Sequence, residues 1–200
     1  MLISHKHKFV FTAIPKTGTR SVYTVLKKHY DGEVYKDHHT VIPDEFKHFY
    51  SFTEIRNPYD RVVSMWWATC KRELSTEKTY LGDDFRVLAG SDKLEDLLSY
   101  MLKTDRKNNL LSKQNDYLKH NRFDCLLRNE KLNEQFKDLP FITGDEDLPR
   151  VNSTTLVGGR TVLARDPDPF AHINSKSLKL INEYYAEDFD VLPYEKVTKL

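Results

Sequence analysis

Near the start of the chain, a short apolar run leads directly into a glycine-containing turn and an amphipathic helix. Residues 8–14 are rich in Val, Ile, Phe and Thr and end at Pro15, which predicts a buried strand. Apolar residues at helical spacing then predict a helix over residues 19–30. Gly18 lies between them and permits backbone angles that other residues avoid. Strand, tight loop and helix in this order are typical of the first unit of a nucleotide-binding α/β domain.

The rest of the chain continues the alternation of strands and helices. Further strands are predicted at residues 33–36, 51–55 and 123–127, and further helices at 43–50, 58–74, 94–102, 130–136 and 174–188. Glycine, proline, asparagine and threonine predict long loops over residues 140–168. We therefore expect an α/β fold, a P-loop-like three-layer α/β/α arrangement with a central parallel sheet, in a single domain of residues 1–200.

Composition excludes several classes of protein. With 39% hydrophobic and 30% charged residues, the chain is globular rather than disordered. Its 31 basic and 30 acidic residues give no net charge that would favour nucleic acid or a membrane surface. Cys70 and Cys125 are too few for a disulfide framework and show no metal-ligand spacing, so no metal is expected. The apolar run 9–14 is too short for a signal peptide or a membrane span, so we expect a soluble cytoplasmic protein.

The turn itself, residues 15–21, reads Pro-Lys-Thr-Gly-Thr-Arg-Ser. The N–H groups and the dipole at a helix start suit a phosphate, and the hydroxyls of this turn add donors. Lys16 places a mobile cation over such an anion. The lysine precedes the glycine, so this is not the Walker A pattern. The alternative is an ordinary strand-to-helix turn with a surface lysine.

A second polar segment, residues 54–64, follows the strand predicted at 51–55. Arg56 stands at the strand end, and Asn57-Pro58 supplies an N-cap residue and a first-position proline for the next helix. Ser64 lies about two turns into that helix. An arginine fork and a hydroxyl so placed suit a second phosphate, although the segment alone is also a well-capped helix.

Together the two segments resemble those of the sulfotransferases that use 3′-phosphoadenosine 5′-phosphosulfate (PAPS). The first resembles the family's 5′-phosphosulfate loop and the second its 3′-phosphate segment, and their order and separation of about 35 residues also fit. The likeness is greatest to carbohydrate sulfotransferases of the heparan sulfate 2-O type and to small bacterial or viral relatives. It continues more weakly through residues 114–118, 128–132, 148–152 and 184–194.

The resemblance implies a set of PAPS-binding residues. Those assigned to the 5′-phosphosulfate are Lys16, Thr17, Gly18, Thr19 and Ser21. Arg56 and Ser64 are assigned to the 3′-phosphate. Arg20 stands where many relatives have threonine, and it is expected either to add a phosphate contact or to pair with a carboxylate.

Glu54 departs from the family pattern, which usually has an apolar residue there. On a strand it shares a face with Arg56. A buried carboxylate needs a partner, and Arg56, Arg20 and Arg61 are the candidates.

The implied reaction is an in-line transfer of the sulfuryl group from the 5′-phosphate to an acceptor oxygen, with PAP as product. Charge builds on the bridging oxygen, and a preorganised cation there is worth about 3–4 kcal/mol. Lys16 is assigned this role. A kinase of the P-loop-like type acting on small molecules is one rival, but it predicts a lysine after the glycine and an aspartate for magnesium. A non-catalytic PAP-binding protein is the other.

The acceptor hydroxyl must lose a proton. Residues 36–40, Lys-Asp-His-His-Thr, resemble the family's His-x-Ser/Thr segment, whose histidine is the proposed base. That register selects His38, and His39 remains open, as does a pair of solvated loop histidines. Glu130 is an alternative carboxylate base or a residue that charges a helix N-terminus.

The acceptor is expected to be a carbohydrate or a small alcohol or phenol. Trp66 and Trp67 are adjacent, so both cannot face the same side of a helix; one is expected in the core and the other to stack on a ring. Arg150 and Asn152 lie in the late loops, which often shape substrate sites. Residues 103–122 are rich in Lys and Arg and form either a basic rim or a solvated loop.

Overall fold

The computed structural model describes residues 1–35, 41–71, 88, 91–104, 111–149, 156–157, 160–161 and 166–200. The chain divides into two compact units. The first unit comprises Met1–Arg56 and Gln114–Ser153, and the second comprises Asn57–Lys113 and Thr154–Leu200. The single domain expected for residues 1–200 stays a prediction.

A five-stranded sheet forms the first unit, with the order β3-β1-β2-β4-β5. Its strands are β1 (Leu2–Ser4), β2 (Phe9–Thr12), β3 (Glu33–Val34), β4 (Tyr50–Ile55) and β5 (Cys125–Arg128). β2, β4 and β5 run parallel, whereas β1 is antiparallel to both β2 and β3. The sheet is therefore mixed, and the central parallel sheet expected from the sequence is found for β2, β4 and β5. β1 has too few residues to show strand periodicity, and it is ordered by pairing with the strands on either side.

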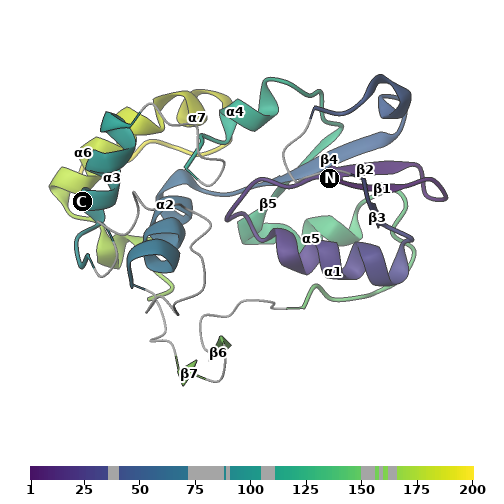
Figure 1. Cartoon of the computed structure of the whole chain (residues 1–200), viewed down its shortest axis with the longest axis horizontal. Helices are drawn as coiled ribbons and strands as arrows, with labels where there is room; N and C mark the ends of the chain where they lie inside the picture. Colours follow the sequence, from purple (N-terminus) through teal and green to yellow (C-terminus); the bar gives the residue numbers. More distant parts are fainter. Residues whose placement is uncertain are drawn as a thin grey trace. The chain divides into compact units, whose positions relative to one another are not determined.

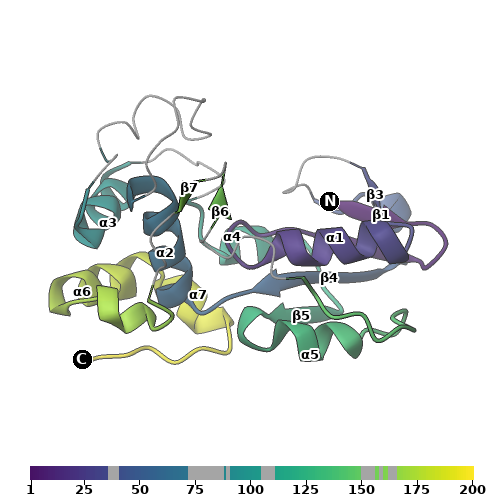
Figure 2. The ribbon, with the colours of Figure 1, turned by 90° about the horizontal axis from the view of Figure 1, so that it is seen from below.

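Alternation along β1 and β2 gives the sheet two apolar faces. Leu2, Phe9 and Phe11 face one cluster, while Ile3 and Val10 face another. Helices α1 (Thr19–His29) and α5 (Leu132–Lys137) cover the first face, as Figures 1 and 2 show. The second face packs against residues around the 3-10 turn η1 (Asp44–Phe46), which replaces the longer helix predicted at 43–50. The three-layer arrangement stays a prediction.

Two short elements complete the first unit. The 3-10 turn η4 (Asn129–Lys131) follows β5 and leads into α5, and α4 (Asn115–Leu118) is a single turn before β5. The helix predicted at 130–136 is therefore divided between η4 and α5. The strand predicted at 51–55 and the helix predicted at 19–30 are confirmed by β4 and α1 within one residue at each end.

The second unit is helical in the part that the structure describes. Its elements are α2 (Pro58–Trp66), the π-helical turn η2 (Trp67–Lys71), α3 (Leu94–Lys103), the 3-10 turn η5 (Pro169–His172), α6 (Ser175–Tyr184), α7 (Ala186–Val191) and a hairpin of β6 (Leu156–Val157) with β7 (Arg160–Thr161). Of the helix predicted at 58–74, residues 58–66 form α2 and 67–71 form η2, while 72–74 lie outside the described residues. The helix predicted at 174–188 breaks at Tyr185. α3 packs against α6, and the residues that the two helices bury include Leu97 and Leu178.

Candidate functional site

The turn between β2 and α1 adopts an unusual backbone conformation. Lys16 has φ 69° and Gly18 has φ 113°, both in the left-handed region. A Cβ atom at Gly18 would lie 2.6 Å from Asn129 Nδ2 and 3.1 Å from Leu132 Cδ2. Glycine is therefore required for its backbone angles and for the space that it leaves. α1 begins at the next residue, and no side chain caps it through a hydrogen bond.

Two threonine hydroxyls fold this turn onto the end of β2. Thr17 is fully buried, and its Oγ1 donates to the Ile14 carbonyl at 2.8 Å. Thr19 Oγ1 donates to the same carbonyl at 3.0 Å. The Thr17 hydroxyl is thus engaged inside the turn. An anion at this helix start would instead meet main-chain N–H groups of the first turn.

Arg56 reaches this turn from the end of β4. Its Nη1 donates to the Lys16 carbonyl at 3.0 Å. The side-chain amide of the fully buried Gln114 fixes the main chain of Arg56, accepting from its N–H at 2.9 Å and donating to its carbonyl at 2.8 Å. The structure therefore brings a residue of each sequence motif, Lys16 and Arg56, into contact.

Asn129 joins the same group from the element after β5. Its Nδ2 donates to the Thr17 carbonyl. The carboxyl ends of three neighbouring parallel strands thus deliver Thr17, Arg56 and Asn129 to one edge of the sheet, which is where open α/β sheets place their ligands. Gln114 and Asn129 are not among the residues predicted for this site. The only sign of them in the sequence is that each stands in a segment of weaker family likeness.

Glu54 lies fully buried on β4 beside this turn. Its Oε2 is 3.2 Å from Thr17 Oγ1, within hydrogen-bonding distance. Burial raises the pKa of this carboxyl to about 8, although the hydroxyls of Thr17 and Thr19 and the charge of Arg56 act in the opposite direction. Of the three arginines expected as partners for Glu54, Arg56 is the one whose charge lowers the Glu54 pKa. The side chain within hydrogen-bonding distance of the Glu54 carboxyl is that of Thr17. Burial, and secondly the charge of Glu54, also raise the pKa of Tyr23.

A comparison with known protein families identifies the family of this chain. A model of the sulfotransferase family matches residues 1–195. The chain belongs to the sulfotransferase family. Searches of curated proteins and of solved structures gave no match. As a member of this family, the chain is a transferase whose expected chemistry is sulfuryl transfer to a hydroxyl group.

The remaining predicted residues of this sulfotransferase fall into three groups. Arg20 is exposed and Ser21 half-buried on the first turn of α1, and Ser64 is half-buried on α2 in the second unit. Glu130, on η4, places its Oε2 4.0 Å from Arg128 Nε. Outside the described residues lie His38, His39, Arg150 and Asn152.

Three aromatic rings gather in the second unit. Trp66 is buried and Trp67 half-buried, and their ring centroids lie 5.9 Å apart. The His172 ring lies 5.6 Å from each of them. The expectation that one tryptophan is part of the core is confirmed for Trp66, whereas Trp67 is half-buried.

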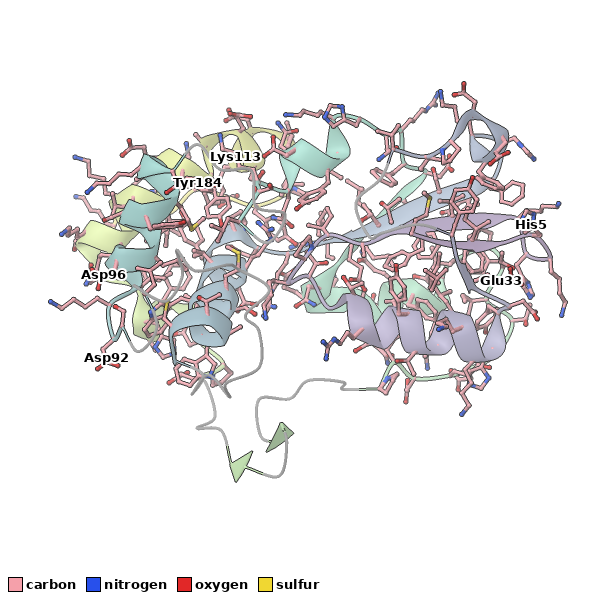
Figure 3. The ribbon with its side chains drawn as sticks, in the orientation of Figure 1. His5, Glu33, Asp92, Asp96, Lys113 and Tyr184 are labelled. Carbon is pink, nitrogen blue, oxygen red and sulfur yellow. The ribbon has the colours of Figure 1, made fainter. Side chains whose placement is uncertain are left out.

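Part of the Lys- and Arg-rich stretch at 103–122 is also placed. Lys113 Nζ lies 2.7 Å from Glu187 Oε1 and 5.8 Å from the centroid of the Tyr184 ring (Figure 3). In the part of the chain that the structure describes, no helix is long and apolar enough to cross a bilayer. Over the same residues, no group of three His, Cys, Asp or Glu side chains is placed to hold a metal ion.

Proposed function

We propose that this sulfotransferase moves a sulfuryl group from PAPS to the hydroxyl of a carbohydrate or of a small alcohol or phenol. The observation that carries the proposal is the turn after β2. There Lys16, the left-handed Gly18 and the start of α1 lie together, and Arg56 contacts the turn. This arrangement offers an anion a helix N-terminus, a mobile ammonium group and a guanidinium group.

The proposed donor site uses both sequence motifs. The 5′-phosphosulfate group is assigned to Lys16, Thr17, Gly18, Thr19, Arg20 and Ser21, with Thr17 contributing main-chain atoms because its hydroxyl is engaged with Ile14. The 3′-phosphate is assigned to Arg56 and Ser64. The first turn of α1 contains no acidic residue, which supports an anion at this helix end.

The proposed transfer is in line. The acceptor oxygen forms a bond to sulfur as the bond between sulfur and the bridging oxygen breaks, and PAP leaves. Lys16 stabilises the charge that builds on that oxygen. His38 accepts the acceptor's proton as general base, and His39 and Glu130 are the alternatives. The proposal invokes no metal ion.

The acceptor is assigned to aromatic rings of the second unit and to two residues of the late loops. The rings of Trp66 and Trp67 lie together with that of His172, and such a cluster suits stacking on a sugar or phenol ring. Arg150 and Asn152 are also assigned to the acceptor because they stand in the late loops. We further propose that the chain adopts the P-loop-like three-layer fold as a single domain over residues 1–200 and acts in the cytoplasm.

A transfer assay with labelled PAPS tests the proposal directly. The purified chain is incubated with a panel of glycans, phenols and small alcohols, and we expect label in at least one acceptor. Lys16→Ala and His38→Ala should each abolish most of that transfer. If PAP binds but no acceptor is labelled by the wild type or by either variant, the chain is a non-catalytic PAP-binding protein.

Thermal unfolding distinguishes a site for PAP from a site for Mg-ATP. PAP at 100 times its Kd stabilises the folded state by about 2.7 kcal/mol, which raises the Tm of a chain of this size by several degrees. We expect this shift with PAP in the presence of a chelator and none with Mg-ATP. The reverse result would identify a kinase.

A further inference from the structure

Glu54 is an ionisable side chain that the proposed reaction does not use. It is fully buried on β4, one strand position before Ile55 and two before Arg56. Its Oε1 has no hydrogen-bond partner among the described residues. An ionised carboxylate in such a position is costly because burial removes its hydration. Its presence beside the anion-binding turn therefore calls for an explanation.

The hydrogen atoms around Glu54 favour a neutral carboxyl group. The Thr17 hydroxyl has one hydrogen, and two oxygens compete for it: the Ile14 carbonyl at 2.8 Å and Glu54 Oε2 at 3.2 Å. If Thr17 donates to the nearer oxygen, its own oxygen is left as an acceptor facing Oε2. A protonated Glu54 can then donate to Thr17 Oγ1, so that both hydrogen bonds form at once.

The groups that act on Glu54 come from each element around it. Tyr23 on α1 is coupled to it electrostatically, and Thr17 and Thr19 face it from the turn. Leu127 is its register partner on β5. The positive charge that acts on it is that of Arg56, whose Nη1 is bonded to the Lys16 carbonyl. A phosphate bound by Arg56 and the turn would offset that positive charge and disfavour an ionised Glu54.

We propose that Glu54 is a positioning residue: the turn holds the phosphate firmly only while the Glu54 carboxyl is neutral, so that an ionised Glu54 takes up a proton when the donor binds. This inference rests on the proposed function. The proton comes from the solvent and forms an O–H bond on the Glu54 carboxyl. No other bond is made or broken.

The direction of the pH dependence follows from burial. In the unliganded protein, burial raises the pKa of Glu54 to about 8, and a bound anion raises it further. Below pH 8, Glu54 is mostly neutral in both states, and PAP affinity is constant. Above pH 8, the unliganded protein loses the proton that the complex must recover, so affinity falls by up to about tenfold per pH unit.

Titration calorimetry with PAP tests this coupling. The Kd is measured from pH 7 to about 9.5 for the wild type and Glu54→Gln, in paired buffers of different ionisation enthalpy. We expect the wild type to take up protons above pH 8 and its Kd to rise. Glu54→Gln can donate its amide N–H to the Thr17 oxygen, as the neutral carboxyl does, but cannot titrate, so its Kd should be constant and its proton uptake absent.

Two further variants complete the experiment. Glu33→Gln removes an exposed carboxylate on the edge strand β3 (Figure 3) and should behave as the wild type. Glu54→Leu replaces the carboxyl by an apolar group. It should bind PAP without pH dependence and more weakly than Glu54→Gln, because the contact with Thr17 is lost. It also serves if Glu54→Gln does not fold.

The outcomes distinguish this inference from the function beneath it. PAP binding without proton uptake, or an identical pH profile in the wild type and Glu54→Gln, overturns the role of Glu54 and leaves the donor site intact. If PAP binds at no pH, the proposed function fails and the inference fails with it.

Thermal unfolding without ligand measures the purely structural effect. The folded-state pKa of Glu54 is raised, so its favourable contribution is complete below the unfolded-state pKa near 4.5 and is lost as the pH rises to about 8. The Tm of Glu54→Gln relative to the wild type should therefore increase over that window. A structural role alone moves this Tm difference but not the proton uptake on binding.

Discussion

The helices α1 and α2 both follow a strand of the parallel part of the sheet, yet they begin in opposite ways. Gly18 precedes α1 in the left-handed conformation, without a side-chain cap. Asn57 precedes α2, and its Oδ1 accepts from the Tyr59 N–H at 3.0 Å. Pro58 occupies the first position of α2, where it removes a donor, and Asp60 supplies negative charge. α2 thus satisfies its own N-terminus.

The difference indicates which groups each helix start can offer to an anionic ligand. The start of α1 has no acidic residue and carries Arg20, whose charge is unfavourable beside the positive end of the helix dipole. A bound anion would reverse that effect. At the start of α2, the main chain is already capped, so we expect its motif to contribute through the side chains of Arg56 and Ser64.

Replacing Lys16 by alanine should have the largest effect, because it removes the cation from the uncapped turn. We expect a fall of about 10²–10³ in kcat, the usual loss for a group that stabilises transition-state charge. PAP affinity should fall less, since the main chain of the turn remains. Transfer rates at saturating PAPS measure the effect. Lys27→Ala, in the last turn of α1, is the control, and equal losses in the two variants would show that Lys16 has no specific role in the reaction.

Gly18→Ala alters the geometry of the uncapped turn instead of its charge. The left-handed φ and the approach of Asn129 Nδ2 should together cost about 1–3 kcal/mol of the free energy of unfolding, and PAP affinity should also fall. Chemical denaturation and PAP titration measure the two effects. The control is Gly144→Ala, which measures crowding without a left-handed φ: its added Cβ would displace the Glu146 carboxylate, which accepts a hydrogen bond from the Tyr30 hydroxyl. A Gly18 variant as stable as the control would show that the turn tolerates another conformation.

Asn57→Ala removes the cap from α2. We expect a loss of about 1 kcal/mol in the free energy of unfolding, typical of an N-cap substitution, with PAP affinity nearly unchanged. Asn57→Asp, which keeps the capping oxygen, should restore stability. A large loss of PAP binding in Asn57→Ala, with stability retained, would mean that the start of α2 also holds the ligand and that the contrast with α1 is wrong.

Much of the framework could be predicted because its signals are local. β2, β4 and α1 follow from apolar periodicity together with nearby glycine and proline. β1 could not be predicted, because its three residues depend on pairing with β2 and β3. The helix predicted at 43–50 forms only the 3-10 turn η1, whose Phe46 packs in the cluster on the second face of the sheet. Here tertiary packing outweighed local propensity.

The residues of the candidate site also divide into those that the sequence predicts and those that only the folded structure shows. Lys16, Gly18 and Arg56 stand in short contiguous motifs that indicate their chemistry. Gln114 and Asn129 act on main-chain atoms of Arg56 and Thr17, which are distant in sequence. Such contacts leave no residue pattern, since any main chain offers the same N–H and carbonyl groups. The hydrogen bond from the Thr17 hydroxyl to the Ile14 carbonyl likewise could not be predicted, because it depends on the conformation of the folded turn.

Arg20→Ala should have the smallest effect, and it should change stability and PAP affinity in opposite directions. Without ligand, the variant should be more stable than the wild type by about 0.3–1 kcal/mol, because a positive charge leaves the positive end of α1. Its PAP affinity should be lower and less dependent on salt. Lys28→Ala, at the opposite end of α1, should instead lower stability, since a cation there is favourable. If both variants lost stability and neither affected PAP binding, Arg20 would act only in the stability of the fold. Its charge would then have no part in anion binding at the start of α1.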